Sequence, residues 1–143
     1  MLEKFHVAKK DIVHVEEKRL RTVTKEILMT QGIPEKDAIL ATDALIKADL
    51  RGVESHGVSN MLRAYLGAFK SNSLNPKPNW KIVKETPSCA TINSDNGLGI
   101  VVAPQAMEIA VEKAKKTGAG IVTMNNCGHL GMLAYHSMIA SDN

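Results

Sequence analysis

The sequence predicts an α/β protein in which a helical segment precedes a mixed α/β sheet unit. Apolar residues recur at spacings of three and four through the first half of the chain, which is the pattern of amphipathic helices. After a polar loop at residues 71–79, short β-prone runs flank one long helical pattern, an order typical of a parallel or mixed sheet. We therefore expect a helical segment at residues 1–75 and the start of a sheet-containing domain at residues 76–143.

The first half of the chain predicts three helices after an N-terminal arm at residues 1–15. Apolar spacing defines a helix at residues 15–31, and a glycine directly after it is a common helix stop. Pro34 suits the first turn of a second helix, residues 34–51, whose apolar face is built of small side chains. These two helices are expected to pack as an antiparallel pair. A third helix covers residues 58–70.

The second half predicts strands around one long helix. Residues 71–79 contain two prolines and three asparagines, which is loop chemistry. A turn is expected at residues 95–99, and Pro104 is expected to open a fourth helix that ends at Gly118. A fifth helical pattern starts at Leu130 and runs to the end of the chain. The predicted strands are residues 80–84, 88–93 and 120–124.

The composition excludes several classes of protein. The chain has 143 residues, of which 44% are hydrophobic, so it can bury the core of one domain. A net charge of +3 with 23% charged residues argues against both a disordered chain and a dedicated nucleic-acid binder. Unbroken apolar stretches reach only about four residues, whereas a membrane span needs about 20. We expect neither a nucleic-acid partner nor a membrane association.

The two cysteines indicate a reducing compartment. Cys89 and Cys127 lie far apart in the sequence and form no CxxC pattern, which favours free thiols over a disulfide framework. We therefore expect a cytoplasmic protein. Cys127 could act as a nucleophile with His129 as its base, but residues so close in sequence seldom have the required geometry. A buried structural thiol is the expected role.

The first candidate for chemistry is a histidine at the entrance of the third helix. His56 follows Ser55 and precedes a glycine. Imidazole has a pKa near 6.5 and therefore suits proton transfer at neutral pH, and Glu54 or Ser55 could fix its tautomer. The alternative is structural: Ser55 caps the third helix and His56 faces solvent, which is the commoner outcome for so short a motif.

The second candidate is the polar loop after the last predicted strand, which contains Asn126 and His129. Ligands of open α/β sheets usually bind beyond the carboxyl ends of strands, so this loop is well placed. The alternative is a loop whose asparagines satisfy their own backbone. His136 lies seven residues after His129, but no carboxylate or cysteine stands at a suitable helical spacing, so no metal site is predicted.

Two further features have ordinary alternatives. Gly97 and Gly99 form a lone GxG without the third glycine or the later acidic residue of a Rossmann fingerprint, so we expect only a turn there. Arg51 and Arg63 are the arginines near the two histidine loops. Either could clamp a substrate carboxylate, and either could be a solvated charge on a helix.

In order and spacing these segments resemble the type-2 malate/L-lactate dehydrogenase family, whose members are nicotinamide-dependent oxidoreductases with a non-Rossmann α/β fold. The most specific match is ADLRGVESHGV at residues 48–58. DNGLG at residues 95–99 and NCGHLG at residues 126–131 support it. The resemblance extends from about Glu16 to the end of the chain.

The resemblance implies reversible hydride transfer between NAD(P)H and a 2-oxo acid, giving a 2-hydroxy acid such as malate or L-lactate. It leaves open whether the cofactor is NAD or NADP and which acid is preferred. Members are homodimers and more than twice as long, so we expect a truncated, N-terminal portion that is inactive alone. A short last helix and unpaired sheet edges agree with this. The alternative is a non-catalytic helical binding or dimerisation module derived from the family.

The resemblance also implies roles for residues of the motifs. His56 is implied as the general acid/base, with Ser55 beside it in the catalytic site. His129 is implied to face the substrate or the nicotinamide, and Asn126 is implied to contact the cofactor. Tyr65 lies near a position where members often have a tyrosine, and it is therefore assigned to substrate binding.

The chain departs from the family at one position. Many members have an arginine four residues after the SHG histidine to hold the substrate carboxylate, and Asn60 stands there instead. Arg63 lies about one helical turn further along. We therefore assign Arg63 as the predicted substitute for the missing clamp.

Overall fold

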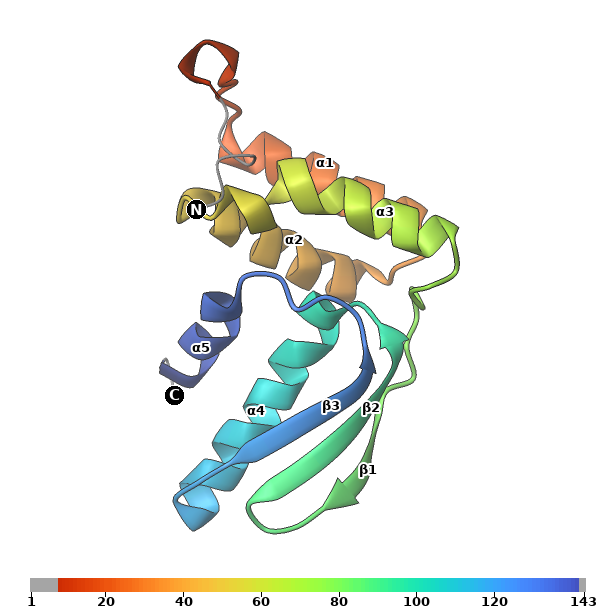
Figure 1. The fold of residues 1–143 in the computed structure, drawn as a ribbon, viewed down its shortest axis with the longest axis vertical. Coiled ribbons are helices and arrows are strands. Elements are labelled where there is room, and N and C mark those ends of the chain that lie inside the picture. Colours follow the sequence, from red (N-terminus) through yellow and green to blue (C-terminus); the bar gives the residue numbers. More distant parts are fainter. Residues whose placement is uncertain (1–7, 142–143) are drawn as a thin grey trace.

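The computed structural model describes residues 8–141, and it confirms the predicted α/β class (Figure 1). Three helices lie together at one end of the molecule, and a small sheet with a long helix along one face forms the other end. The helices are α1 (Glu17–Thr30), α2 (Glu35–Leu50), α3 (Arg63–Lys70), α4 (Gly99–Thr117) and α5 (Leu133–Ser141). The strands are β1 (Lys81–Glu85), β2 (Cys89–Gly97) and β3 (Ile121–Cys127).

Helices α1 and α2 form the expected antiparallel pair (Figure 1). Leu28 of α1 and Leu45 of α2 are fully buried in the core that the pair shares. Ala41 and Ala48 are also fully buried, because small side chains let neighbouring helices approach closely. The observed bounds agree with the predicted helices to within two residues.

The entrance to α3 differs from the predicted regular helix. A 3₁₀ turn covers Glu54–His56, and a π-helical turn covers Val58–Leu62 before α3 begins. The prediction of a single α-helix over residues 58–70 was therefore wrong in its first turn. Apolar spacing does not distinguish a π turn from an α turn over so short a stretch. The turn is of interest because π segments are common near functional sites.

The sheet is mixed, with strand order β1-β2-β3. β1 pairs antiparallel to β2, and β2 pairs parallel to β3 through the α4 crossover. Ile92 of β2 is fully buried against Val102 and Ala106 of α4, so α4 covers one face of the sheet. A second, larger core cluster joins the α1–α3 helices to the first turn of α4 and to α5.

The largest correction concerns residues 95–104. β2 continues to Gly97, and α4 already begins at Gly99, so Pro104 lies inside the helix instead of opening it. Asp95 and Asn96 take left-handed conformations within β2, where the register with β3 shifts. A proline inside a helix costs about 3 kcal/mol. The helix continues before Pro104 because residues 99–103 are all buried, and their packing offsets that cost.

Smaller corrections apply at other boundaries. β3 extends to Cys127, so both asparagines predicted to lie in the loop, Asn125 and Asn126, belong to this strand. α5 begins at Leu133 and not at Leu130. Of the predicted N-terminal arm, residues 1–7 lie outside the described part of the chain, and Lys9–Asp11 form a 3₁₀ turn. Among residues 8–141, no helix combines the length and hydrophobicity that a membrane span requires.

Asp43 of α2 connects three helices by polar contacts. It accepts hydrogen bonds from Arg21 of α1 and from the hydroxyl of Tyr135 of α5, each at 3.0 Å. Lys47, one turn further along α2, pairs with the same carboxylate at 2.9 Å. α5 is therefore held against the helical end of the molecule, which fixes the loop that precedes it.

We predict that Leu45→Ala destabilises the chain by about 2–5 kcal/mol, because it leaves a cavity at a fully buried position. Leu50→Ala is the matched control in the same helix: Leu50 is 62% exposed, and its loss should change the free energy of unfolding by no more than about 0.5 kcal/mol. Chemical denaturation of both variants checks this. Equal effects of the two substitutions would contradict the assigned core.

Candidate active site

His56 lies on the short 3₁₀ turn between α2 and the π-helical turn. Its Nδ1 forms a hydrogen bond with the hydroxyl of Ser55 at 2.8 Å, and the ring is half-buried. Of the two residues that the sequence offered as partners of the imidazole, Glu54 and Ser55, it is Ser55 that contacts it. It does not cap the following helix: the Val58 amide donates to Asp49 instead, at 2.9 Å. The structural alternative for Ser55 is thus wrong.

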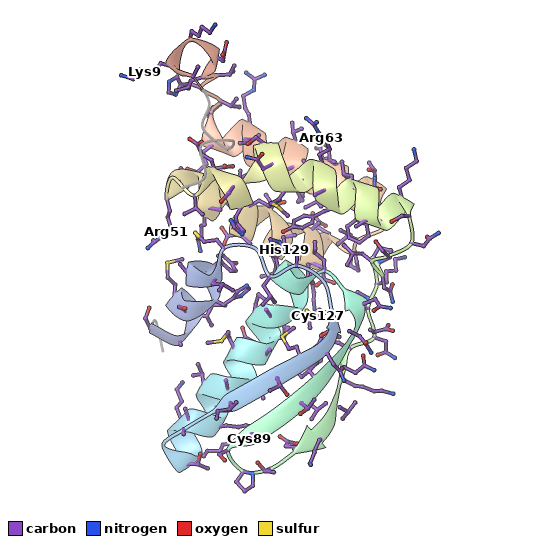
Figure 2. All side chains as sticks on the ribbon, in the orientation of Figure 1. Lys9, Arg51, Arg63, Cys89, Cys127 and His129 are labelled. Carbon is purple, nitrogen blue, oxygen red and sulfur yellow. The ribbon has the colours of Figure 1, made fainter. Side chains whose placement is uncertain are left out.

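His129 lies in the loop between β3 and α5, beneath the helical end of the molecule (Figure 2). Its Nδ1 receives two contacts, from the Tyr65 hydroxyl at 3.0 Å and from the Gly131 backbone N–H at 3.2 Å. A backbone N–H can only donate, so Nδ1 must be the acceptor. The proton of the neutral ring is therefore on Nε2. Burial raises the pKa of Tyr65, which keeps its hydroxyl a donor.

The two histidines, 73 residues apart in the sequence, stack on each other. Their ring centroids are 5.3 Å apart and the rings are inclined by only 16°. His129 is exposed overall, but partial burial of its ring lowers its pKa, and positive charge on His56 lowers that pKa further. The hydrogen bonds to Nδ1 also require an unprotonated nitrogen there. His129 is thus a neutral hydrogen-bond donor at neutral pH.

Close backbone packing places the His129 loop. The Gly128 N–H donates to the Gly97 carbonyl at 2.9 Å, which ties the end of β3 to the end of β2. A Cβ at Gly99 would lie 2.4 Å from the Gly128 oxygen and 2.5 Å from the His129 oxygen. Only a glycine leaves room for the loop to cross the start of α4 so closely. The loop also covers the N-terminus of α4.

Tyr65 and Arg63 have different surroundings on α3. Tyr65, which the resemblance assigned to substrate binding, is buried and contacts His129. Arg63 is exposed and lies on the side of α3 away from His129 (Figure 2). It stands two residues before Tyr65, a spacing at which helical side chains do not share a face. The structure therefore does not bring Arg63 to the histidine pair. Asn60, at the family's arginine position, donates to the Glu54 carbonyl at 2.8 Å and so has a structural partner.

Asn126 and His136 are the remaining candidate residues from the sequence. Asn126 has a left-handed backbone at the end of β3, and its amide contacts Asn93 at 3.2 Å. His136 is buried in α5 and contacts the Leu130 carbonyl at 2.7 Å. Among residues 8–141, no three histidine, cysteine or acidic side chains converge as a metal site would require.

The cysteines have no visible chemical role in the described chain. Cys89 and Cys127 are free and lie at opposite ends of β2 and β3 (Figure 2). Burial raises the pKa of the Cys127 thiol, which makes it a poor nucleophile. A surface groove of about 710 Å³ lies between β1 and α4, and neither His56 nor His129 lines it.

The fold and the site together define an α/β protein with a polar site beyond the carboxyl end of a parallel strand, the usual place for ligands in such sheets. The family described as malate/L-lactate dehydrogenase matches residues 15–143. The chain belongs to this family, which confirms the resemblance of the three motifs.

Individual relatives agree with this membership. The chain is 41% identical over 142 residues to malate dehydrogenase of Pyrococcus abyssi, an alignment that covers 99% of this chain and 39% of that protein. It is 44% identical over 115 residues to L-sulfolactate dehydrogenase of Methanocaldococcus jannaschii, which covers 80% of this chain and 33% of that protein.

A solved structure has the same fold. Malate dehydrogenase from Pyrococcus horikoshii OT3 superposes with a TM-score of 0.90 at 39% sequence identity, covering 96% of this chain and 39% of that one. The chain thus spans little more than a third of the length of the relatives it matches. The helices, the mixed sheet and the histidine loop belong to this shared part.

Sequence reasoning missed Asp49 as a residue of the site. Asp49 belongs to the ADLRGVESHGV motif, but a helix cap is normally expected next to the helix that it caps. The bond from Val58 to Asp49 spans nine residues. A local capping rule cannot find such a contact.

We predict that His56→Ala raises the pKa of His129, because the substitution removes the charge that disfavours the protonated ring. The value should stay below that of free histidine, since the remaining burial still lowers it. Ring titration by NMR measures the shift. His14→Ala, which removes an exposed histidine outside the site, is the control and should leave it unchanged. A fall in the His129 pKa would show that the stacked pair is misassigned.

Proposed function

We propose that the chain is the N-terminal portion of an NAD(P)-dependent dehydrogenase that interconverts a 2-oxo acid and a 2-hydroxy acid such as malate or L-lactate. The observation that carries this proposal is the stacked pair of His56 and His129 at 5.3 Å. Reduction of a ketone produces an alkoxide that needs a proton, and an imidazole supplies one at neutral pH. The family membership agrees with this class of reaction.

His56 is the proposed general acid/base. Ser55 occupies its Nδ1, which leaves Nε2 to exchange a proton with the substrate oxygen. In the reducing direction Nε2 donates the proton, and in the oxidising direction it accepts one. The hydroxyl of Ser55 holds the ring in one orientation for both directions.

His129 is the proposed second contact of the substrate oxygen. Its Nε2–H can donate a hydrogen bond while the Tyr65 hydroxyl and the Gly131 amide hold Nδ1. A neutral donor stabilises negative charge on that oxygen without competing with His56 for the transferred proton. Tyr65 thus serves substrate binding through His129.

The residues present fit the redox end of a nicotinamide cofactor and not its diphosphate. The carbonyl oxygens of Gly128 and His129 pack against Gly99 at the start of α4, the place where a Rossmann fold would hold the diphosphate. Asn126 and the exposed ring of His129 remain as polar groups for the nicotinamide end. NAD(P)H, when bound, supplies the hydride.

Further parts of the proposal concern the whole protein. We propose a homodimer, as the family resemblance implies, and a cytoplasmic location, with which two free thiols are compatible. The preferred acid and the choice between NAD and NADP are properties of the longer protein. Relatives include both malate and L-sulfolactate dehydrogenases.

The proposal is tested by NAD(P)H consumption with a panel of 2-oxo acids, comparing this chain with the longest protein that its reading frame encodes. We expect turnover by the longer protein and none by the 143-residue chain. If neither form turns over any acid, the proposal fails, and the alternative of a helical binding or dimerisation module becomes the better account.

In an active longer protein, His56→Ala should reduce turnover by roughly 100- to 10,000-fold, the range expected for one general acid/base. Cofactor affinity should remain nearly unchanged, because His56 is assigned to the substrate oxygen. Steady-state kinetics and a separate cofactor titration measure both quantities. Unchanged turnover would remove His56 from the mechanism.

Arg63→Lys tests the predicted carboxylate clamp. If Arg63 holds the substrate carboxylate, KM should rise with little change in kcat, because lysine lacks the two-pronged guanidinium geometry. If KM and kcat both stay the same, Arg63 belongs to the solvated face of α3, where its side chain is exposed.

A further inference from the structure

Asp49, near the C-terminal end of α2, lies against the turn that carries His56. Its Oδ2 accepts a hydrogen bond from the Val58 backbone N–H at 2.9 Å. Backbone donors in the first turn of a helical segment lack partners within that segment and need one from elsewhere. Because Asp49 satisfies this donor, the hydroxyl of Ser55 is left to contact His56, at 2.8 Å.

Gly57 shows how closely the carboxylate of Asp49 packs. A Cβ at Gly57 would lie 1.6 Å from Asp49 Oδ1 and 2.3 Å from its Cγ. The φ of Gly57 is −86°, which any residue can adopt. Glycine is therefore required here for space and not for conformation. The Asp49 carboxylate fills the space beside the residue that directly follows His56.

Further hydrogen bonds stabilise the turn that carries His56. Asn60 donates from its side-chain amide to the Glu54 carbonyl at 2.8 Å, and the His56 amide donates to the Val53 carbonyl at 2.9 Å. These bonds lie within the turn and its neighbouring segment. Asp49 is different because it belongs to α2, and it therefore anchors the turn to the helical core.

We propose that Asp49 is a positioning residue that holds the Gly57–Val58 backbone so that His56 stays stacked on His129 and in contact with Ser55. The importance of this role for catalysis rests on the proposed function. The effect of Asp49 on the geometry of the two rings does not depend on it. Its burial raises the pKa of Asp49, the bond from Val58 opposes this, and nearby Glu54 raises it further. The contact with the turn is made by one carboxylate oxygen that accepts from a backbone N–H, so a neutral acceptor of the same shape should serve.

The test uses the 143-residue chain and compares Asp49→Ala, Asp49→Asn and Ser59→Ala. Ser59 is exposed in the same helical turn, so its substitution is the matched control. Two NMR quantities are measured: the nuclear Overhauser effect between the rings of His56 and His129, and the titration of the His129 ring. A thermal melt of each variant reports whether the fold is retained.

We expect Ser59→Ala and Asp49→Asn to keep the Overhauser effect and the lowered pKa of His129. Asp49→Ala should lose the effect, and the pKa of His129 should rise because His56 no longer faces it. If Asp49→Ala fails to fold, Asp49→Ser provides the same comparison with a milder truncation. A folded Ala or Ser variant that keeps the stacked rings would overturn the proposal, and so would an Asn variant that loses them.

A double-mutant cycle with Gly57→Ala tests the contact itself. Gly57→Ala alone should destabilise the chain strongly, and Asp49→Ala should remove much of that cost, because it deletes the three atoms nearest the added Cβ. Additive effects would overturn the assigned packing. These experiments measure ring geometry and stability and not turnover. A negative result would therefore overturn the role of Asp49 and leave the dehydrogenase proposal unaffected. A lack of turnover, in contrast, would overturn the dehydrogenase proposal and leave the positioning role of Asp49 unaffected.

Discussion

The hydrogen bond between Tyr65 and His129 joins the two ends of this molecule at its site. It links α3 to the loop between β3 and α5 across 64 residues of sequence. Beneath it, Tyr65 shares one buried cluster with Leu98, Ile100 and Met132, which come from the start of α4 and the His129 loop. The loop can sit there only because Gly99 leaves room for its backbone. Without this contact, His56 and His129 would not be held next to each other.

The stacked rings divide the chemistry of the site between them. Two imidazoles with centroids 5.3 Å apart cannot both carry a positive charge without repulsion. The backbone N–H of Gly131 decides which of them stays neutral, because it can only donate to Nδ1 of His129. His56, whose Nδ1 meets a hydroxyl that can donate or accept, has no such restriction. The position of the Gly131 backbone N–H thus makes His129 the proposed neutral donor and leaves His56 as the proposed proton carrier.

Patterns of one-dimensional spacing predicted much of the fold. Apolar periodicity located α1 and α2 to within two residues, because each buries one continuous face. The same rules failed at Pro104, where buried packing outweighs the cost of a proline inside α4. They also failed at Val58–Leu62, a π turn whose first backbone N–H has its partner outside the segment, in Asp49.

The site was harder to predict than the fold. Individually, His56 and His129 had structural alternatives that spacing could not remove. The family resemblance implied that both serve one site, and their stacking is visible only in the structure. The contacts of Tyr65 and Asp49 with the site are tertiary, so no local pattern reports them. Arg63 lies one helical turn after Asn60 in the sequence, but it is exposed and stands two residues before Tyr65, a spacing at which two helical side chains do not share a face.

The most direct test of the central claim is the tautomer of His129, measured from the ring nitrogen resonances in proton–nitrogen NMR spectra at neutral pH. The account predicts a neutral ring with its proton on Nε2 and an unprotonated Nδ1 that accepts from Gly131 and Tyr65. A proton on Nδ1, or a charged ring at that pH, would contradict both the geometry and the proposed division of roles between the two histidines.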